Sequence, residues 1–231
     1  MSWLARLMPQ HADVPPKHAA ALDAYRKAPR VAGDTDITRL RFVVVDVETS
    51  GLNPYRDRLL ALGAVAVESM LLRFDDSFTA FMRQRTTSTD ENILVHGIDG
   101  TTQISAPEAS DGLAAFLQYA GKSPLIAYNA DFDRAVIERA LRSTLATTLE
   151  NPWIDLARLA PAVLGGTGAR TLDDWTREHG IENYRRHDAL ADATATAQLL
   201  QVVLAHAAAN RHTRLTDLVE LADAQRWLDR R

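Results

Sequence analysis

Three short segments of the sequence carry the side chains best suited to chemistry. Asp46-Val47-Glu48 ends the strongest β-type run, Tyr128 to Asp133 opens one helical pattern, and His187 to Asp192 opens another. Side chains two positions apart on a strand point to the same face, so Asp46 and Glu48 should project together. Two adjacent carboxylates repel each other, which raises a pKa unless a cation shares them. A bound divalent metal would relieve that repulsion.

Each segment, taken alone, also has a purely structural interpretation. An acid such as Asp133 in the first turn of a helix complements the helix dipole, and Asp188 is a suitable N-cap. His187 lies five residues before Asp192, so one helix turn could bring imidazole and carboxylate to the same edge of a cleft. All three segments fall at a strand end or a helix start, where an α/β sheet forms its ligand crevice. Their combination therefore favours one shared site.

The elements expected around these segments alternate between strand and helix. We expect strands at 39–47, 59–68, 71–82, 124–128 and 153–155, and helices at 17–27, 107–120, 129–145, 156–163, 172–179, 189–208 and 214–228. Asn129 is expected to cap its helix through its side-chain oxygen. The stretch from Asp90 to Ser105 is expected to be a loop. Strands first, followed by alternating strands and helices, predict an α/β fold built on a mixed sheet.

Composition restricts the chemistry that this chain can perform. The sequence contains no cysteine, which excludes disulfides, thiolate zinc sites, iron–sulfur clusters and cysteine nucleophiles. A formal net charge of -4 argues against coating nucleic acid by bulk electrostatics, but it allows a local cleft for one strand end. The longest apolar run, Leu59 to Val67, is shorter than the roughly 20 residues of a membrane span. Since no secretory signal is visible, we expect a cytoplasmic protein without a membrane partner.

Together, the three segments resemble the motifs of the DEDDh 3′–5′ exonucleases. This DnaQ-like group includes the proofreading subunits of bacterial replicative polymerases, oligoribonucleases and RNA-trimming enzymes. The resemblance covers about 42–204. Its first motif stands here as Asp46-Val47-Glu48-Thr49-Ser50-Gly51-Leu52, its second as Tyr128-Asn129-Ala130-Asp131-Phe132-Asp133, and its third as His187 to Asp192.

Two positions bear on the subgroup. Tyr128 stands where the second motif usually has histidine, five positions before the metal-binding acid, so it is not expected to be a ligand. The sister DEDDy group carries a tyrosine four residues before the final aspartate, where this chain has Asp188. The histidine subgroup is therefore favoured.

The resemblance implies a ribonuclease-H-like fold, with a mixed central sheet flanked by helices, and a two-metal site. Two Mg²⁺ or Mn²⁺ ions would be held by four acids, namely Asp46, Glu48, Asp133 and Asp192. All-oxygen ligation suits these ions, which activate the attacking water and stabilise the leaving 3′-oxygen. His187 would accept the proton of that water. The expected product is a nucleoside 5′-monophosphate released from a 3′ end.

The resemblance also assigns the contacts to the substrate. The backbone at Thr49 and Ser50 would meet the terminal nucleotide, and Leu52 would wedge near its base. His96 would lie beside the terminal sugar, with a surface loop position as the alternative. Phe132 is assigned to the same site, with core packing as the alternative. Such apolar groups hold unpaired bases without reading their sequence.

We therefore expect an N-terminal helical extension at 1–38, an exonuclease domain at 39–208 and a C-terminal helix at 209–231. The leading hypothesis is a metal-dependent 3′–5′ exonuclease acting on single-stranded DNA or RNA ends, with a polymerase or another replication or repair protein as a candidate partner.

Three other functions are weighed against this one. The alternatives are an exoribonuclease or oligoribonuclease-like activity, a phosphatase with an aspartyl nucleophile, and an idle binding or polymerase-associated subunit of the same fold. A phosphatase would need an Asp-x-Asp motif and a well-placed lysine, and the intact set of acids with His187 argues against an idle subunit. DNA and RNA present the same phosphodiester to the metals, so these motifs do not distinguish them.

Overall fold

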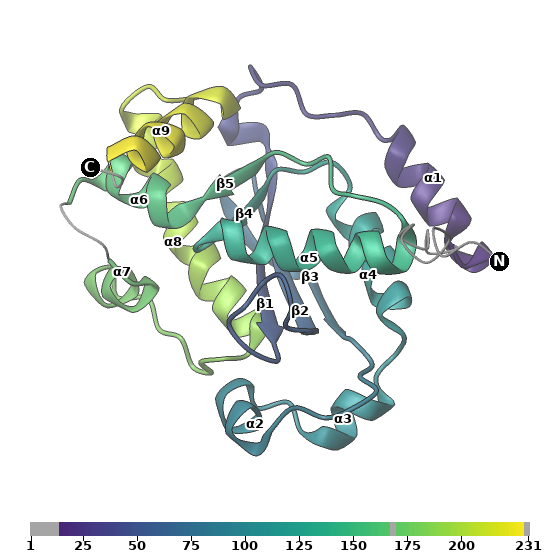
Figure 1. Ribbon diagram of the computed structural model, residues 1–231. Helices are drawn as coiled ribbons and strands as arrows, with labels where there is room; N and C mark the ends of the chain where they lie inside the picture. Colours follow the sequence, from purple (N-terminus) through teal and green to yellow (C-terminus); the bar gives the residue numbers. More distant parts are fainter. Residues whose placement is uncertain (1–13, 167–169, 229–231) are drawn as a thin grey trace.

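A five-stranded mixed sheet with helices on both faces forms the centre of the fold (Figure 1). The computed structural model describes residues 14–166 and 170–228, so residues 1–13 of the expected N-terminal extension lie outside the described part. The strand order is β3-β2-β1-β4-β5, in which β2 runs antiparallel to both neighbours and β1, β4 and β5 are parallel. The strands are β1 (Arg41–Thr49), β2 (Leu59–Glu68), β3 (Leu71–Phe81), β4 (Leu125–Ala127) and β5 (Trp153–Asp155). The predicted α/β fold on a mixed sheet is confirmed.

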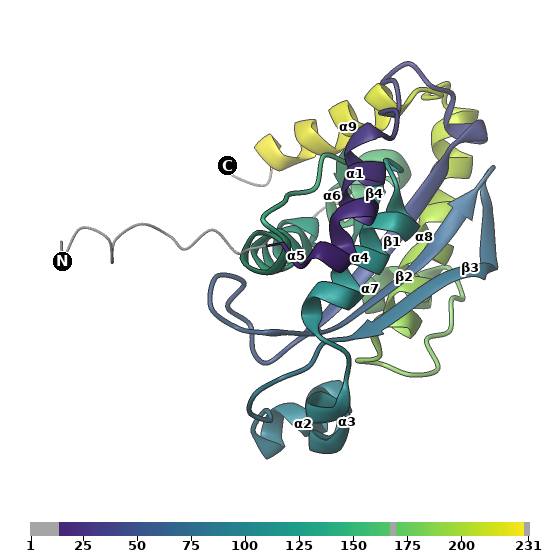
Figure 2. The same ribbon diagram turned by 90° about the vertical axis from the view of Figure 1, so that its right-hand side faces the viewer.

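Two groups of helices cover the two faces of the sheet. Figure 2 shows α4 and α5 on one face and α8 on the other. The face of α4 also carries α1, and the face of α8 also carries α6 and α9. The bounds of these helices and of α7 are α1 (Ala19–Lys27), α4 (Ala109–Ala120), α5 (Ala130–Leu145), α6 (Leu156–Leu164), α7 (Leu172–Glu178), α8 (Ala189–Ala209) and α9 (Leu215–Leu228). In the part of the chain that the structure describes, no helix is long and apolar enough to cross a membrane.

The alternation of side chains along β1 divides the core into two clusters. Val43 and Val45 pack with residues of α4 and α5, whereas Phe42 packs with residues of α6 and α8. Successive side chains of a strand point to opposite faces. The even-numbered Asp46 and Glu48 therefore continue the face that α8 covers.

The β2–β3 hairpin is confirmed, with a tight two-residue turn. Ser69 and Met70 both have positive φ, 50° and 66°, which is the conformation of a type I′ turn and matches the twist of the flanking strands. This hairpin places β3 at the edge of the sheet, where one of its sides remains open to solvent.

The expected loop at 90–105 is wrong, because this segment forms two short helices, α2 (Asp90–His96) and α3 (Gly100–Ser105). Thr89 and Asp99 cap them by accepting hydrogen bonds from the backbone N–H groups of Asn92 and Thr102. Each helix is too short to show a complete apolar periodicity in the sequence, so only its cap could have revealed it.

Helices outside the region of the motifs are also tied to the sheet. The hydroxyl of Tyr25 on α1 donates to Asn151 Oδ1 at 2.7 Å and accepts from the N–H of Glu150 at 2.8 Å. On the opposite face, Leu215 and Leu218 of α9 join the core cluster of α6 and α8. Both flanking helices thus pack on the unit that carries the motifs.

Candidate active site

Two acids stand at the carboxyl end of the central strand. Asp46 and Glu48 both lie near the carboxyl end of β1 and are partly buried. Asp46 is paired across the sheet with Gly63 of β2. The strand thereby holds both carboxylates on the face that α8 covers, as the alternation of the sequence predicts.

The start of α8 approaches this face at unusually close range because β2 has a glycine there. A Cβ built on Gly63 would lie only 2.3 Å from the backbone of Ala189 and Leu190. Asp188 caps the helix, with Oδ1 accepting from the N–H groups of Leu190 and Ala191 at 3.2 and 3.1 Å. One turn later, Asp192 is buried against the sheet.

The three acids of β1 and α8 form one compact group. Ligand oxygens of Asp46, Glu48 and Asp192 all lie within 4.8 Å of one another. Three carboxylates at this spacing suit a hard cation that takes oxygen ligands, such as Mg²⁺ or Mn²⁺. The donor set therefore fits a divalent metal ion.

The fourth acid, Asp133, approaches from the other side of the sheet. It lies in the first turn of α5 and is only 4 % exposed. It is not one of the three residues of the compact group, but its charge is the largest Coulombic contribution that raises the pKa of Asp46. Asp133 is therefore an electrostatic neighbour of the group.

The turn that begins α5 differs from the expected cap. Asn129 occupies the N-cap position, but it has the left-handed conformation (φ 64°) and its side chain makes no capping bond. Its backbone N–H instead donates to Oδ1 of Asp155 at 3.1 Å, at the end of β5. The expectation of an Asn129 side-chain cap is wrong, since a partner on another strand fixes this turn.

The acids are held in a protein environment that favours their protonated forms. Burial, followed by the charges of Asp192 and Asp188, raises the pKa of Glu48 to about 8. Burial also raises the pKa values of Asp46 and Asp133. Among the described cations, Arg186 opposes this effect at both Asp46 and Glu48. Buried carboxylates whose negative charges are so weakly balanced attract a divalent cation strongly.

The backbone of His187 contacts the acid group directly. Its N–H donates to Oδ2 of Asp192 at 2.9 Å, and its φ of 61° is in the left-handed region. The residue precedes α8 and is exposed. This contact is therefore made by the main chain of a turn that precedes the helix, and the expected place of the imidazole beside the acids stays a prediction.

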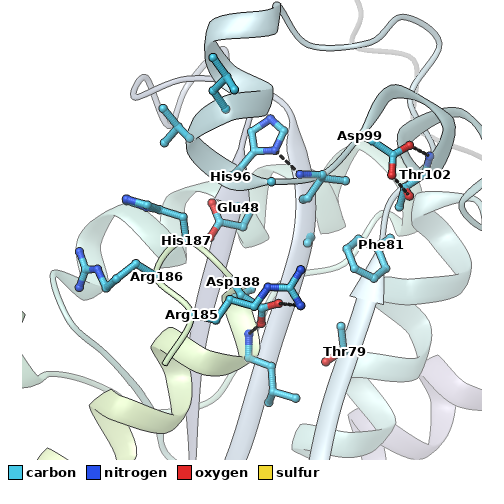
Figure 3. Close-up of a pocket in the computed structure, with 17 residues that line it drawn as sticks. Glu48, Thr79, Phe81, His96, Asp99, Thr102, Arg185, Arg186, His187 and Asp188 are labelled. Carbon is cyan, nitrogen blue, oxygen red and sulfur yellow. Dashed lines mark hydrogen bonds and ion pairs between the residues drawn. The ribbon is translucent and has the colours of Figure 1, made fainter. Parts of the chain in front are cut away.

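A cavity of about 360 Å³, here called the central cavity, opens beside Glu48 and His187. It lies between the α2–α3 segment, the end of β3 and the loop before α8, and its lining includes Thr79, Phe81, Leu94, Val95, His96, Ile98, Arg185, Arg186 and Asp188. Figure 3 shows Glu48, His96 and His187 toward one end and Arg185 toward β3. Carboxylates and two histidines thus share one hollow.

His96, expected near the substrate sugar, lines the central cavity at the end of α2. It is 4 % exposed, and burial lowers its pKa. Its Nδ1 accepts from the N–H of Ile98 at 3.0 Å, while Nε2 is buried without a hydrogen-bond partner. The alternative of a surface loop position is thereby excluded.

The other residues expected to hold substrate lie around the β1–β2 loop and on α5. Thr49 Oγ1 donates to the carbonyl of Gly51 at 2.5 Å, and the carbonyl of Ser50 accepts from Asn92 Nδ2 at 2.7 Å. Leu52 projects from this loop with 93 % of its surface exposed. Phe132 is partly buried and packs against the core cluster of α4 and α5.

Two residues of the loop before α8 lie close to Asp192, and the spacing of the motifs predicts neither contact. The side-chain amide of Asn183 donates to Oδ1 of Asp192. The guanidinium of Arg186 donates to Asp173 Oδ1 at 2.6 Å and lies 4.0 Å from Oδ1 of Asp192. Asn183 precedes Asp192 by nine positions in an irregular segment, where no periodicity links the two.

A ribonuclease-H-like sheet with acids converging above its central strand defines the class of nucleases to which this arrangement corresponds. Residues 43–200 match the family model described as Exonuclease, of the RNase T type. The chain belongs to this exonuclease family, which confirms the resemblance to the DnaQ-like enzymes.

Relatives and solved structures agree with this family. The chain is 31 % identical over 168 residues to the PolC-type DNA polymerase III of Bacillus subtilis, covering 72 % of this chain and 12 % of that protein. It is 29 % identical over 168 residues to a DNA polymerase III subunit epsilon-like protein of Rhodobacter capsulatus, covering 71 % and 24 %. The chain thus spans about an eighth of the PolC-type relatives (12 %).

Two solved structures share the fold. Exonuclease X in complex with 5′ overhanging duplex DNA superimposes with a TM-score of 0.60 at 18 % identity, covering 78 % of this chain and 99 % of that one. Escherichia coli exonuclease I in complex with a dT13 oligonucleotide gives 0.59 at 20 % identity, covering 75 % and 43 %. The expected ribonuclease-H-like fold is confirmed.

Proposed function

We propose that this protein is a metal-dependent 3′–5′ exonuclease that shortens single-stranded DNA ends and releases nucleoside 5′-monophosphates. The observation that carries the proposal is the convergence of Asp46, Glu48 and Asp192 to within 4.8 Å, where Glu48 lines the same cavity as His187. An idle binding subunit would have no need to keep Asp46 and Glu48 in a group where burial and neighbouring charges raise their pKa values.

In the proposed reaction, Asp46, Glu48, Asp133 and Asp192 hold the metal ions. A pair of divalent ions held there would supply the activation of the attacking water and the stabilisation of the leaving oxygen. An imidazole nitrogen of His187 accepts one proton from that water. The water oxygen bonds to the terminal phosphorus, the bond from phosphorus to the preceding 3′-oxygen breaks, and that oxygen takes up a proton. The shortened strand keeps a 3′-hydroxyl.

The terminal nucleotide is placed between the β1–β2 loop and α2. Thr49 and Ser50 offer their backbone to it, and the exposed Leu52 wedges against its base. His96, which lines the central cavity, lies beside its sugar. Phe132 is proposed for the substrate site as well. It lies in the first turn of α5, is partly buried, and packs at the edge of the core cluster of α4 and α5.

DNA is the favoured substrate, because relatives of the chain are DNA polymerase III proteins and structural neighbours were solved with bound DNA. The PolC-type and epsilon-like relatives are DNA polymerase III proteins, and the two structural neighbours were solved with DNA. These names support single-stranded DNA over an oligoribonuclease-like substrate. They also support a replicative polymerase, or another replication or repair protein, as the partner.

The unit that performs this reaction is proposed to be residues 39–208, with 1–38 as an extension and 209–231 as a terminal helix. The family match at 43–200 lies within that unit. A cytoplasmic location is part of the same proposal, because the proposed substrate of the protein is a DNA end.

A direct assay tests the proposal. Matched DNA and RNA oligonucleotides with a 5′ label are incubated with the full chain and Mg²⁺ or Mn²⁺, with and without EDTA. The expected result is a ladder of labelled products shortened from the 3′ end, 5′-monophosphates detected by chromatography, faster loss of DNA than of RNA, and no cleavage in EDTA. Full-length DNA under every condition would overturn the proposal.

A further inference from the structure

A second hollow of about 390 Å³, here called the outer groove, continues the central cavity. The two share Arg185, Asp188 and Leu190 as lining residues. The outer groove runs between β3 and α8, which pack against each other (Figure 2). Its far end is marked by Phe74 on β3 and Gln198 on α8.

Two exposed aromatic rings line the outer groove. Phe74 is 68 % exposed and Tyr184 is 89 % exposed. Large apolar rings gathered in one hollow of a surface are a feature of binding sites. The flat faces of such rings accept unpaired bases of any identity.

The position of the rings suits a strand that leaves the central cavity. Phe81 lines the central cavity, and Phe74 lies seven residues earlier on the same strand, past Ser77 and within the stretch where β3 shifts its register against β2. In Figure 3, Arg185 lies between Asp188 and the β3 residues. It stands where the two hollows join. Its Nη1 lies 3.6 Å from Oδ2 of Asp188, and its other N–H groups could donate to a phosphate.

A third hollow also adjoins the acids but suits a strand less well. It has about 290 Å³ and is lined by Asp46, Tyr128, Arg170 and Asp192, among others. The ring of Tyr128 is packed against the core, and its hydroxyl donates to the carbonyl of Arg170 at 2.6 Å. This tyrosine, which replaces the usual histidine, is thus occupied in holding the end of the α6–α7 connection.

We infer that the single strand upstream of the cleaved end follows the outer groove, with its bases stacked on Phe74 and Tyr184 and a phosphate near Arg185. The inference rests on the proposed exonuclease function, since it concerns the remainder of the same substrate. The groove fixes the direction in which a bound strand leaves the acids, along β3 and α8 toward the end marked by Phe74.

The charged residues of the outer groove indicate which interaction would hold the strand. Glu182 and Asp188 line it together with Arg185, so the groove has no excess of positive charge among these residues. Stacking rather than counterion release must then supply the binding there. The contribution of the two rings should therefore be insensitive to salt.

The experiment compares a dinucleotide, which fills only the terminal site, with an oligothymidylate of about 12 nucleotides, which is long enough to enter the groove. The variant is Phe74→Ala combined with Tyr184→Ala, in the full chain. Its KM for the long strand should rise about tenfold or more, since stacking of one base on one ring is worth about tenfold in affinity. Its kcat and its KM for the dinucleotide should equal those of the wild type.

Two further variants act as controls. Trp227→Ala removes an exposed aromatic ring of α9, outside the groove, and should leave both KM values unchanged. Tyr184→Phe keeps the ring and should keep the wild-type KM for the long strand. The tenfold effect of the double variant should persist when the salt concentration is raised.

The outcomes separate this inference from the function on which it rests. A long-strand KM of the double variant that stays at the wild-type value, with normal dinucleotide cleavage, overturns the groove and leaves the exonuclease intact; a protein segment would then be the better occupant. A rise in KM for both substrates also overturns it, because the rings would then act on the terminal site. A wild-type protein that cleaves neither substrate overturns the proposed function itself.

Discussion

Asn183 and His187 hold the two carboxylate oxygens of Asp192 from the same loop, Asn183 through its side-chain amide to Oδ1 and His187 through its backbone N–H to Oδ2. A carboxylate has about four lone-pair positions, so one hydrogen bond to each oxygen still leaves room for a metal. Asn183 Oδ1 also accepts from the N–H of Arg185 at 3.2 Å. Asn183 therefore links the orientation of Asp192 to the fold of the loop.

Replacing Asn183 by alanine should weaken metal binding. Partners that orient a metal ligand are typically worth about 10- to 100-fold in metal affinity or activity. Calorimetric titration of Asn183→Ala with Mn²⁺ should show a loss in that range. Asn210→Ala is the matched control, because Asn210 Nδ2 donates to the carbonyl of His206 at the far end of α8; equal affinities in the two variants would contradict this role.

Asp46→Asn should abolish cleavage without destabilising the metal-free protein. Asparagine is nearly isosteric, and the change removes a carboxyl group whose pKa is raised by burial and by the charge of Asp133. Thermal unfolding in EDTA should therefore occur at the same temperature as in the wild type or at a higher one. Retention of turnover by Asp46→Asn would refute its assignment as a ligand.

His187→Asn should separate the proposed proton transfer from metal binding. Asparagine accepts the left-handed backbone conformation of this position, and the N–H that donates to Asp192 is kept. We expect kcat to fall about 10²- to 10⁴-fold, the usual contribution of a general base, while the Kd for Mn²⁺ stays constant. A variant that loses metal but turns over normally when saturated would contradict the base role.

The metal-free protein should become less stable as the pH rises from about 4.5, the ordinary pKa of Glu48, to about 8, its pKa in the folded protein. In that interval the folded state binds more protons at Glu48 than the unfolded state, so the free energy of unfolding falls with pH. The Glu48→Gln variant lacks this titration and should gain stability relative to the wild type over the same interval.

Mg²⁺ should reverse this loss, because it takes the place of the protons on the acids. The increase in Tm on adding Mg²⁺ should therefore be larger at the alkaline end of that interval than at the acidic end. Differential scanning calorimetry measures both effects. A wild type and Glu48→Gln that show parallel stability profiles in EDTA would contradict the raised pKa of Glu48.

Gly63→Ala should lower stability and metal affinity together. Its Cβ would lie 2.3 Å from the backbone of Ala189 and Leu190, so the start of α8 must move away from β2 and take Asp192 with it. Overpacking of this kind costs about 1–3 kcal/mol.

The control for this change is Gly33→Ala, whose Cβ would meet only the end of the Thr216 side chain, at 2.6 Å. It tests a tight contact remote from the acids and should leave metal affinity unchanged. Metal titrations at a temperature where both variants are folded distinguish the two effects. Wild-type Mn²⁺ affinity in Gly63→Ala would show that the close approach of α8 does not position Asp192.

Local rules predicted those features that depend on only one element. The alternation along β1 was sufficient to place Asp46 and Glu48 on one face, and the hairpin between β2 and β3 followed from two apolar runs separated by two residues. The capping role of Asp188 followed from its type and its position before an apolar helix. Each of these needs no distant partner.

The features that were missed depend on contacts between distant segments. The left-handed turn at Asn129 is fixed by Asp155 of another strand, and the contact of Asn183 with Asp192 requires the loop to be folded. The close approach of α8 depends on Gly63, whose importance is visible only once β2 and α8 are packed. The helices α2 and α3 were missed for another reason, since each is shorter than the window in which an apolar period can be recognised.

The proposed proton acceptor and the acids lie in parts of the molecule that differ in secondary structure and in exposure to solvent. Asp46, Asp133 and Asp192 are set in regular elements of the core, whereas His187 sits in an exposed turn at the molecular surface. On the proposed roles, catalytic rate and ion occupancy are therefore separable properties. A regulator that turned the imidazole of His187 away, while its backbone N–H stayed on Asp192, would stop cleavage and leave the metal ions bound.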